Sequence, residues 1–224
     1  MPVDFIDANI LQSEFHDEIH KKIIEDKVKL HKDFHHLNSS QAMCFNLFYP
    51  IVIEERFNIL SDILDVRFDE IHDVYFEYVY DKEEQTNFDF YIKDKNQKLF
   101  FEVKYTEQKF TSQKIDESHI NKYNNLYKER LKIFKSLDME NFFKNYQLFR
   151  NLIYISSGTV VFIIPGIRED LKRSIIQVCE KYLNIEQQNR VKTIFIEEIV
   201  YAIISNDDKL KNYYVMFKDK YIFW

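Results

Sequence analysis

The chain has 224 residues, of which 46% are hydrophobic and 17% aromatic, so it can bury a sizeable core. Two glycines and two cysteines leave no Gly-rich phosphate loop, no disulfide framework and no Cys-rich zinc site. The net charge of −6 argues against a broad basic surface, but residues 93–135 hold eleven Lys or Arg and only six Asp or Glu. This basic stretch could hold a polyanion, and it could equally be a solvated charged face.

The N-terminal part of the chain is expected to be helical. Residues 9–36 place Phe15, Ile19, Ile23, Ile24 and Val28 on one helical face, and we interpret residues 1–36 as a helical extension of a single domain covering residues 1–224.

A second helix is expected to follow an N-cap at Asn38, Ser39 or Ser40. Pro50 should end or kink it, because proline cannot donate the backbone hydrogen bond of a helix interior. A further helix is expected from about Pro50 to Leu64.

Strands and helices then alternate along the chain. The β-rich segments and the helical segments between them predict a three-strand antiparallel meander followed by helix, strand, helix and strand. The fold class is therefore α/β (or α+β), with a central mixed sheet and helices on both faces. The C-terminal tail YYVMFKDKYIFW could pair at a sheet edge. The strands are expected at 74–80, 88–92, 99–105, 159–164 and 191–196, and the helices at about 114–157, 168–183 and 197–204.

The segment LFFEVKY raises the question of why a strand rich in Phe carries Glu102 and Lys104. An acidic residue two positions before a lysine occurs five times in the chain, but residues two apart share a face only in a strand. Glu102 and Lys104 are the one such pair in a convincing strand. The pair could belong to an exposed hairpin, where cross-strand ion pairs contribute about 0.2–1 kcal/mol each. The apolar neighbours favour a site instead.

Asp89 on the preceding strand would complete this site. Alternation predicts that Asp89 and Tyr91 face away from Phe88, Phe90 and Ile92. If the face of Asp89 meets that of Glu102 and Lys104, two carboxylates could bind Mg²⁺ or Mn²⁺, with the Val103 carbonyl as a further ligand. Lys104 would orient or deprotonate a water, or stabilise charge on a phosphate.

The elements TNFDFYI and LFFEVKYTE, taken with HHLNSSQAMCFNLFYP and NYQLFRNLIY, resemble the PD-(D/E)XK nuclease superfamily, in particular a bacterial restriction-endonuclease-like subgroup. The resemblance spans roughly residues 35–165, and it departs from the family pattern at Phe88, where the motif has proline. It implies that Asp89 and Glu102 are metal ligands and that Lys104 is the catalytic lysine.

Supporting residues are also predicted. Gln147, Arg150 and Tyr154 lie on one helical face, where Gln147 could meet a phosphate or the metal-bound water and Arg150 a phosphate oxygen, although a buried amide in an amphipathic helix would look the same.

A third acidic ligand would come first from Glu77, the lone acid of VYFEYVY, with Gln41 as the next candidate. Glu54 and Glu55 are further possibilities.

These features predict a metal-dependent nuclease that cleaves double-stranded DNA through a Mg²⁺-bound water. The basic stretch, including Lys109 and Lys114, would bind the phosphates, and a homodimer would supply two active sites. The competing interpretation is a non-catalytic nucleic-acid-binding or protein-interaction module on the same fold. No apolar run approaches the roughly 20 residues that span a bilayer, and no targeting pattern opens the chain, so we expect a cytoplasmic protein without membrane contact.

Overall fold

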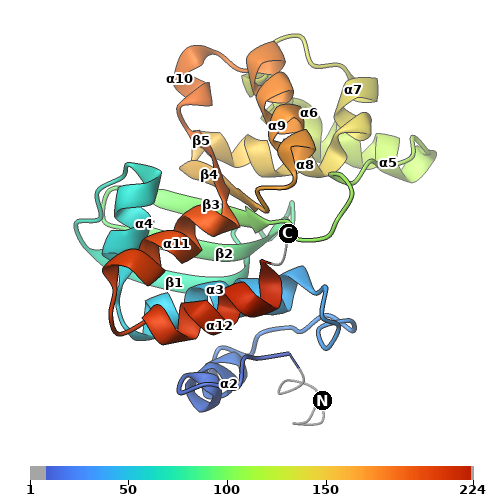
Figure 1. Ribbon diagram of the computed structural model, residues 1–224. Coiled ribbons are helices and arrows are strands. Elements are labelled where there is room, and N and C mark those ends of the chain that lie inside the picture. Colours follow the sequence, from blue (N-terminus) through green and yellow to red (C-terminus); the bar gives the residue numbers. More distant parts are fainter. Residues whose placement is uncertain (1–8, 223–224) are drawn as a thin grey trace.

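A five-stranded mixed sheet forms the centre of the protein, as the computed structural model shows for residues 9–222 (Figure 1). Residues 1–8 and 223–224, and with them the start of the predicted N-terminal extension, lie outside the described residues. The strands run in the order β1-β2-β3-β4-β5, with β1, β2 and β3 antiparallel and β3, β4 and β5 parallel. This confirms the predicted α/β architecture. The strands are β1 (Ile71–Val79), β2 (Asn87–Asp94), β3 (Lys98–Val103), β4 (Thr159–Ile164) and β5 (Val191–Phe195).

Helices cover both faces of the sheet, each over its own apolar cluster. Figure 1 shows α7, α8 and α9 on one side of the strands and α3, α11 and α12 on the other. We call the side of α3 the first face and the side of α8 the second face. The first face is covered by α3 (Ser40–Ile53), α4 (Phe57–Leu64), α11 (Ile196–Asn206) and α12 (Lys211–Tyr221), and the second by α7 (Met139–Lys144), α8 (Tyr146–Leu152) and α9 (Glu169–Tyr182).

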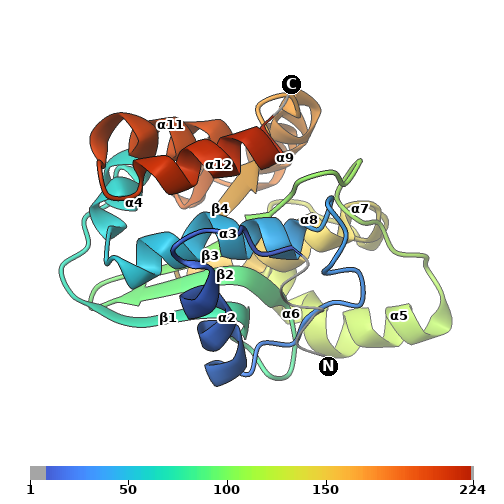
Figure 2. The same cartoon turned by 60° about the horizontal axis from the view of Figure 1, so that its bottom comes forward.

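The helix α3 lies against β2 and β3, where Figure 2 shows it crossing the sheet. Ser39 is its N-cap, with the side-chain oxygen accepting from the Ala42 amide. Pro50 does not end the helix, one of the two outcomes predicted for it, because α3 continues through it to Ile53. The carbonyl of Asn46, which loses its helical partner at Pro50, accepts a hydrogen bond from the Tyr213 hydroxyl of α12 at 2.9 Å. A tertiary contact therefore replaces the missing bond.

The N-terminal helix α2 (His16–Glu25) packs on α3 through Phe15, Ile19 and Ile23. Ile24, expected on the same face, is 56% exposed, because it lies a further 100° around the helix from Ile23. The chain then turns at Lys27, which has a φ of 51°.

The predicted helical stretch 114–157 is a series of short pieces. Loops and changes of helix type separate them, and aromatic side chains from most pieces pack into the core of the second face. The pieces besides α7 and α8 are α5 (Glu117–Lys122), the π-helix η1 (Tyr123–Tyr127), α6 (Lys128–Arg130), η2 (Leu131–Ile133) and η3 (Ile153–Ser156); the short α10 (Ile185–Gln188) precedes β5.

The C-terminal tail forms the helix α12 and not the edge strand that its β-rich composition predicted. Tyr213, Tyr214, Phe217 and Tyr221 recur at helical spacing and are all buried against α3 and α11. Burial of this face outweighs the β-propensity of the single residues. None of the helices in residues 9–222 combines the length and apolar character that a bilayer-spanning segment needs.

Candidate active site

The candidate site lies at a fork between β2 and β3. The two strands pair from Lys93 and Lys98 as far as Phe90 and Phe101, and no pairing follows beyond that point. There the Asp89 carboxylate accepts a hydrogen bond from the backbone amide of Val103 at 2.6 Å. The Asp89 carboxylate of β2 thus accepts the hydrogen bond that a backbone carbonyl would accept in a regular sheet, and this bond fixes Asp89 against β3.

The neighbouring strand β1 is irregular at the same level. Its pairing with β2 omits Glu77, which has a φ of 52°, and Asp89 opposite it. Phe88 packs in the core of the second face with Tyr91, whereas Phe90 packs in that of the first. The predicted grouping of Phe88 with Phe90 and Ile92 was therefore wrong, because strict alternation along β2 is interrupted at Asp89, where the pairing with β1 is also interrupted.

Glu102 and Lys104 project from β3 onto the second face and are almost completely buried. The Lys104 Nζ lies 2.9 Å from Glu102 Oε1, and the same oxygen accepts from Gln147 Nε2 of α8 at 2.8 Å. The Gln147 oxygen accepts from the amide and hydroxyl of Thr111, so its amide group has a fixed orientation. The three predicted residues Glu102, Lys104 and Gln147 are therefore in direct contact.

The charges of this cluster are unevenly balanced. Burial raises the pKa of Asp89 well above its ordinary value, and the nearby Glu102 and Glu77 raise it further. Burial alone would lower the pKa of Lys104, but Glu102 and Glu107 outweigh it and hold the pKa above its ordinary value. The neighbouring carboxylates thus favour the charged form of Lys104, while they repel one another.

Glu77 is a further acid near Asp89, since its charge helps to raise the pKa of Asp89. Burial raises its pKa, and its Oε1 is buried without a hydrogen-bond partner, while Oε2 lies 3.7 Å from His31 Nε2. Gln41 instead holds the chain before α3, through the His31 amide and the Lys29 carbonyl. The other candidates lie elsewhere, since Glu54 pairs with Lys209 and Glu55 lines a hollow beside α4.

The residues of the fork fit a hard divalent cation. Asp89 and Glu102 offer carboxylate oxygens, and Mg²⁺ is commonly held by one or two carboxylates with the rest of its sites left to water and phosphate. An orphaned Glu77 oxygen and mutual repulsion of the carboxylates both favour added positive charge. Within residues 9–222 no group of three or more His, Cys, Asp or Glu is arranged as a metal cage, so Glu77 as third ligand stays a prediction. The Val103 carbonyl also stays a prediction, because the described contact to Asp89 comes from its amide.

Arg150 does not join this cluster. Its Nε donates to Glu84 at 2.7 Å, and Glu84 also accepts from the Tyr127 hydroxyl at 2.6 Å, the Tyr154 hydroxyl at 2.9 Å and the Thr86 amide at 2.7 Å. We call these five residues the Glu84 cluster. Glu84 was not predicted as a site residue, because in the loop DKEEQTN nothing in the sequence distinguishes it from the exposed Glu83 beside it.

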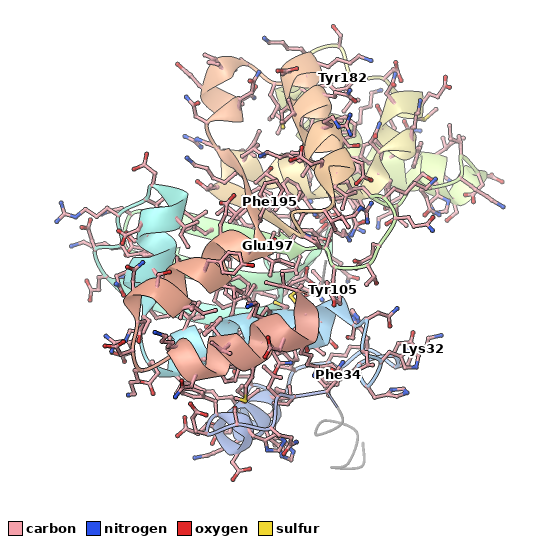
Figure 3. The ribbon with its side chains drawn as sticks, viewed as in Figure 1. Lys32, Phe34, Tyr105, Tyr182, Phe195 and Glu197 are labelled. Carbon is pink, nitrogen blue, oxygen red and sulfur yellow. The ribbon has the colours of Figure 1, made fainter. Side chains whose placement is uncertain are left out.

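The remaining basic candidates lie on the segment that follows β3. Lys109 and Lys114 are both exposed there. Tyr105, labelled in Figure 3, closes the start of this segment against α12, with its hydroxyl donating to the Tyr221 carbonyl at 3.3 Å. The guanidinium of Arg168 donates to the carbonyls of Glu107 and Gln108, so the segment is anchored while its lysines face solvent.

A family model connects this architecture with known proteins. It is REase-ARP, described as Restriction Endonuclease associating with ARP, and it matches residues 1–222. No curated protein and no solved structure matches the chain. The family match is consistent with the restriction-endonuclease-like fold that the sequence motifs predicted. Because the match extends over nearly the whole chain, this protein belongs to the REase-ARP family.

Proposed function

We propose that this protein is a metal-dependent nuclease that hydrolyses phosphodiester bonds in DNA. The observation that supports this proposal is the convergence of Asp89, Glu102 and Lys104 at the fork between β2 and β3. Membership of a restriction-endonuclease family supports a nuclease-like role independently of this geometry.

Each side chain has a distinct role in this proposal. Asp89 and Glu102 would hold Mg²⁺ or Mn²⁺, which when bound would supply an acidified water and a positive charge beside the scissile phosphate. Lys104, a cation held by Glu102, would stabilise negative charge on the phosphate oxygens. Gln147 would keep the Glu102 carboxylate oriented, since its amide is fixed from the other side by Thr111.

The substrate would approach over the exposed lysines of the segment after β3. Lys109 and Lys114 would contact phosphates, so binding should weaken steeply as salt rises. Arg150 is committed to Glu84, and a phosphate contact would require it to give up that ion pair. Cleavage of both strands of a duplex would need two such sites, which a homodimer would provide.

A plasmid-nicking assay tests the proposal. The wild type should nick supercoiled DNA with Mg²⁺ or Mn²⁺ and not with EDTA, and Asp89→Asn or Lys104→Met should lose about 10²- to 10³-fold in rate. Asp208→Asn is the matched control, because this exposed aspartate lies in the loop between α11 and α12. Equal rates in all four proteins would remove the fork residues from the mechanism.

A non-catalytic nucleic-acid-binding module on the same fold is the alternative function. The observation that favours it is that Lys104 and Gln147 already satisfy Glu102 Oε1. It predicts metal-independent DNA binding with no cleavage in the same assay. The family description also names an association with ARP, so pull-down with that partner would show whether activity needs it.

A further inference from the structure

A group of tyrosines lies on the second face where the helices do not cover the sheet completely. Tyr75 and Tyr78 come from β1, Tyr80 follows it, and Tyr91 comes from β2. We call these four residues the tyrosine platform. Tyr91 is buried under the others, Tyr78 and Tyr80 are partly exposed, and Tyr75 is 42% exposed.

Three rings of the tyrosine platform, those of Tyr75, Tyr78 and Tyr91, are close to parallel, whereas the Tyr80 ring is inclined by 61° to Tyr78 and by 39° to Tyr91. The centroids of Tyr75 and Tyr78 are 4.9 Å apart with 14° between the ring planes, and those of Tyr78 and Tyr91 are 4.5 Å apart with 24°. Tyr75 and Tyr91 are also parallel within 14°. A buried ring beneath fixes the orientation of the outer ones, so the platform presents an ordered aromatic surface at the open edge of the sheet.

Two lysines accompany these rings. Lys98 Nζ donates to the Tyr80 hydroxyl at 2.8 Å and lies 5.0 Å from the centre of the Tyr80 ring. Lys93 Nζ lies 3.1 Å from Asp73, whose other oxygen accepts from the Tyr75 hydroxyl at 3.2 Å. The charge of Lys93 is thus balanced by a carboxylate, and the charge of Lys98 lies beside the aromatic rings with a tyrosine hydroxyl as its partner.

The tyrosine platform continues into a hollow of about 270 Å³. Its wall includes Tyr80, Tyr154, Ser156 and Ser157, which offer ring faces and hydroxyl groups. Two acids, Asp81 and Glu129, also line it, and the Arg130 guanidinium is paired with Asp81 and Glu83. Gly158, which follows Ser157 of the wall, lies so close to the Lys98 carbonyl that a Cβ atom on it would clash. The wall of the hollow is therefore next to Lys98, beside the tyrosine platform. The hollow is large enough for a single nucleobase and polar enough to hydrogen-bond with its edge.

The same face connects the platform to the candidate active site. Phe100 and Glu102 alternate along β3, and Lys104 follows the end of the strand at the same spacing, where its Nζ lies 2.9 Å from Glu102 Oε1. The rings of Tyr80 and Tyr91 pack on Phe100 at 5.1 Å and 5.2 Å. A polymer bound on the platform would thus lie on the same face as the Glu102–Lys104 pair.

We propose that the tyrosine platform binds single-stranded nucleic acid, with bases stacked on Tyr75 and Tyr78 and one base in the adjoining hollow. This inference rests on the proposed function, which it extends to a substrate with a single-stranded segment. Surfaces that hold single strands combine exposed aromatic faces with lysines along a groove, because every base has a face that stacks. A second copy of the chain fits less well, because the rim of hydroxyls and ammonium groups lacks the apolar core of a stable homodimer interface.

Fluorescence anisotropy tests the proposal with the full chain in EDTA, using a labelled oligothymidylate of about 12 nucleotides, within the length that one such groove covers. Loss of one stacked base should weaken binding by about 5- to 150-fold, which is the expectation for Tyr75→Ala and Tyr78→Ala. Tyr75→Phe should keep near wild-type binding, because the ring remains. Tyr201→Ala is the control for removal of an exposed tyrosine, since Tyr201 is 48% exposed on α11.

The salt dependence of binding tests the lysine beside the tyrosine platform separately. Lys98→Ala should reduce this salt dependence by about one phosphate contact.

Equal affinity in wild type and Tyr75→Ala would overturn the proposal, as would absence of oligothymidylate binding by the wild type at low salt. Concentration-dependent dimerisation that Tyr75→Ala abolishes, measured by sedimentation, would assign the surface to a second copy instead. Tyr75 is exposed enough that its replacement should leave the melting temperature unchanged, so the test does not depend on the more buried Tyr78. Because EDTA removes cleavage from the measurement, a failure here and a failure of the nicking assay are separate results.

Discussion

Two buried carboxylate clusters lie on the second face of the sheet, and they are balanced in opposite ways. Glu84 has no exposed side-chain surface and accepts hydrogen bonds from one amide, two tyrosine hydroxyls and Arg150. Burial would raise its pKa, but Arg150 and these hydrogen bonds outweigh burial, so the pKa lies below its ordinary value. At the fork, Asp89 has one short bond to the Val103 amide, and its pKa is raised by burial and by Glu102.

The difference separates a structural carboxylate from one suited to bind a cation. A buried charge with all its partners stabilises the fold and has nothing left to offer a ligand. Crowded carboxylates with fewer donors carry a repulsion that a divalent cation would relieve. A buried acid beside a basic residue is therefore weak evidence for a site until its donors have been counted.

The largest effect should come from neutralising Glu84. Glu84→Gln leaves the Arg150 charge without its partner, so we expect a loss of about 3 kcal/mol in the free energy of unfolding, the lower end for a broken buried pair because Arg150 keeps some contact with water. Urea unfolding measures it. Glu83→Gln is the matched control, since Glu83 is exposed, and equal stability of both variants would contradict the structural role.

The next largest change in stability should come from binding of a divalent cation at the fork. At a concentration 100 times the dissociation constant, Mn²⁺ or Mg²⁺ should stabilise the wild type by about 2.7 kcal/mol. The rise in melting temperature should be lost in Asp89→Asn and kept in Glu84→Gln. Asp89→Asn should itself be no less stable than wild type in EDTA, because it removes a repelling charge. If the cation stabilises Asp89→Asn as much as wild type, it binds elsewhere.

A smaller effect is expected from Gln147, which orients Glu102 without carrying charge. Gln147→Ala removes the 2.8 Å bond to Glu102 and should lower the nicking rate about tenfold, the equivalent of a typical hydrogen bond. Gln147→Glu should be worse, since it adds a fourth carboxylate to Glu77, Asp89 and Glu102. Nicking rates that do not distinguish these variants from wild type would show that Glu102 needs no such support.

The smallest effect is expected when the pH is lowered, and it concerns the stability that the Glu84 cluster provides. The folded pKa of Glu84 is lowered, so its stabilisation is present above the ordinary glutamate pKa and is lost as the pH falls through the folded value. Below about pH 4 the stability difference between wild type and Glu84→Gln should therefore shrink. Urea midpoints measured from pH 6 to about pH 3 would show this, and a constant difference would contradict it.

Much of the site followed from spacing along the chain. An acid and a lysine two residues apart in a strand must share a face, and Asp89 on the preceding strand of a meander must lie nearby. The strands β4 and β5, the helix α9 and an N-cap at one of Asn38, Ser39 or Ser40 followed from equally local patterns.

What local patterns could not supply came from contacts between distant segments. Tyr213, more than 160 residues away in the chain, hydrogen-bonds the Asn46 carbonyl and allows α3 to continue past Pro50. Burial against α3 turned a β-rich tail into α12. The pairing of Glu84 with Arg150 likewise joins residues 66 apart.

The sequence by itself determined that Glu102 and Lys104 share a face, because the two-residue period of a regular strand is a local property of the backbone. It did not determine the face of Phe88, where that period is interrupted. The tertiary structure decided which of the buried acids has its charge fully compensated. That balance depends on donors from distant segments, and their positions are set only when both faces of the sheet are packed.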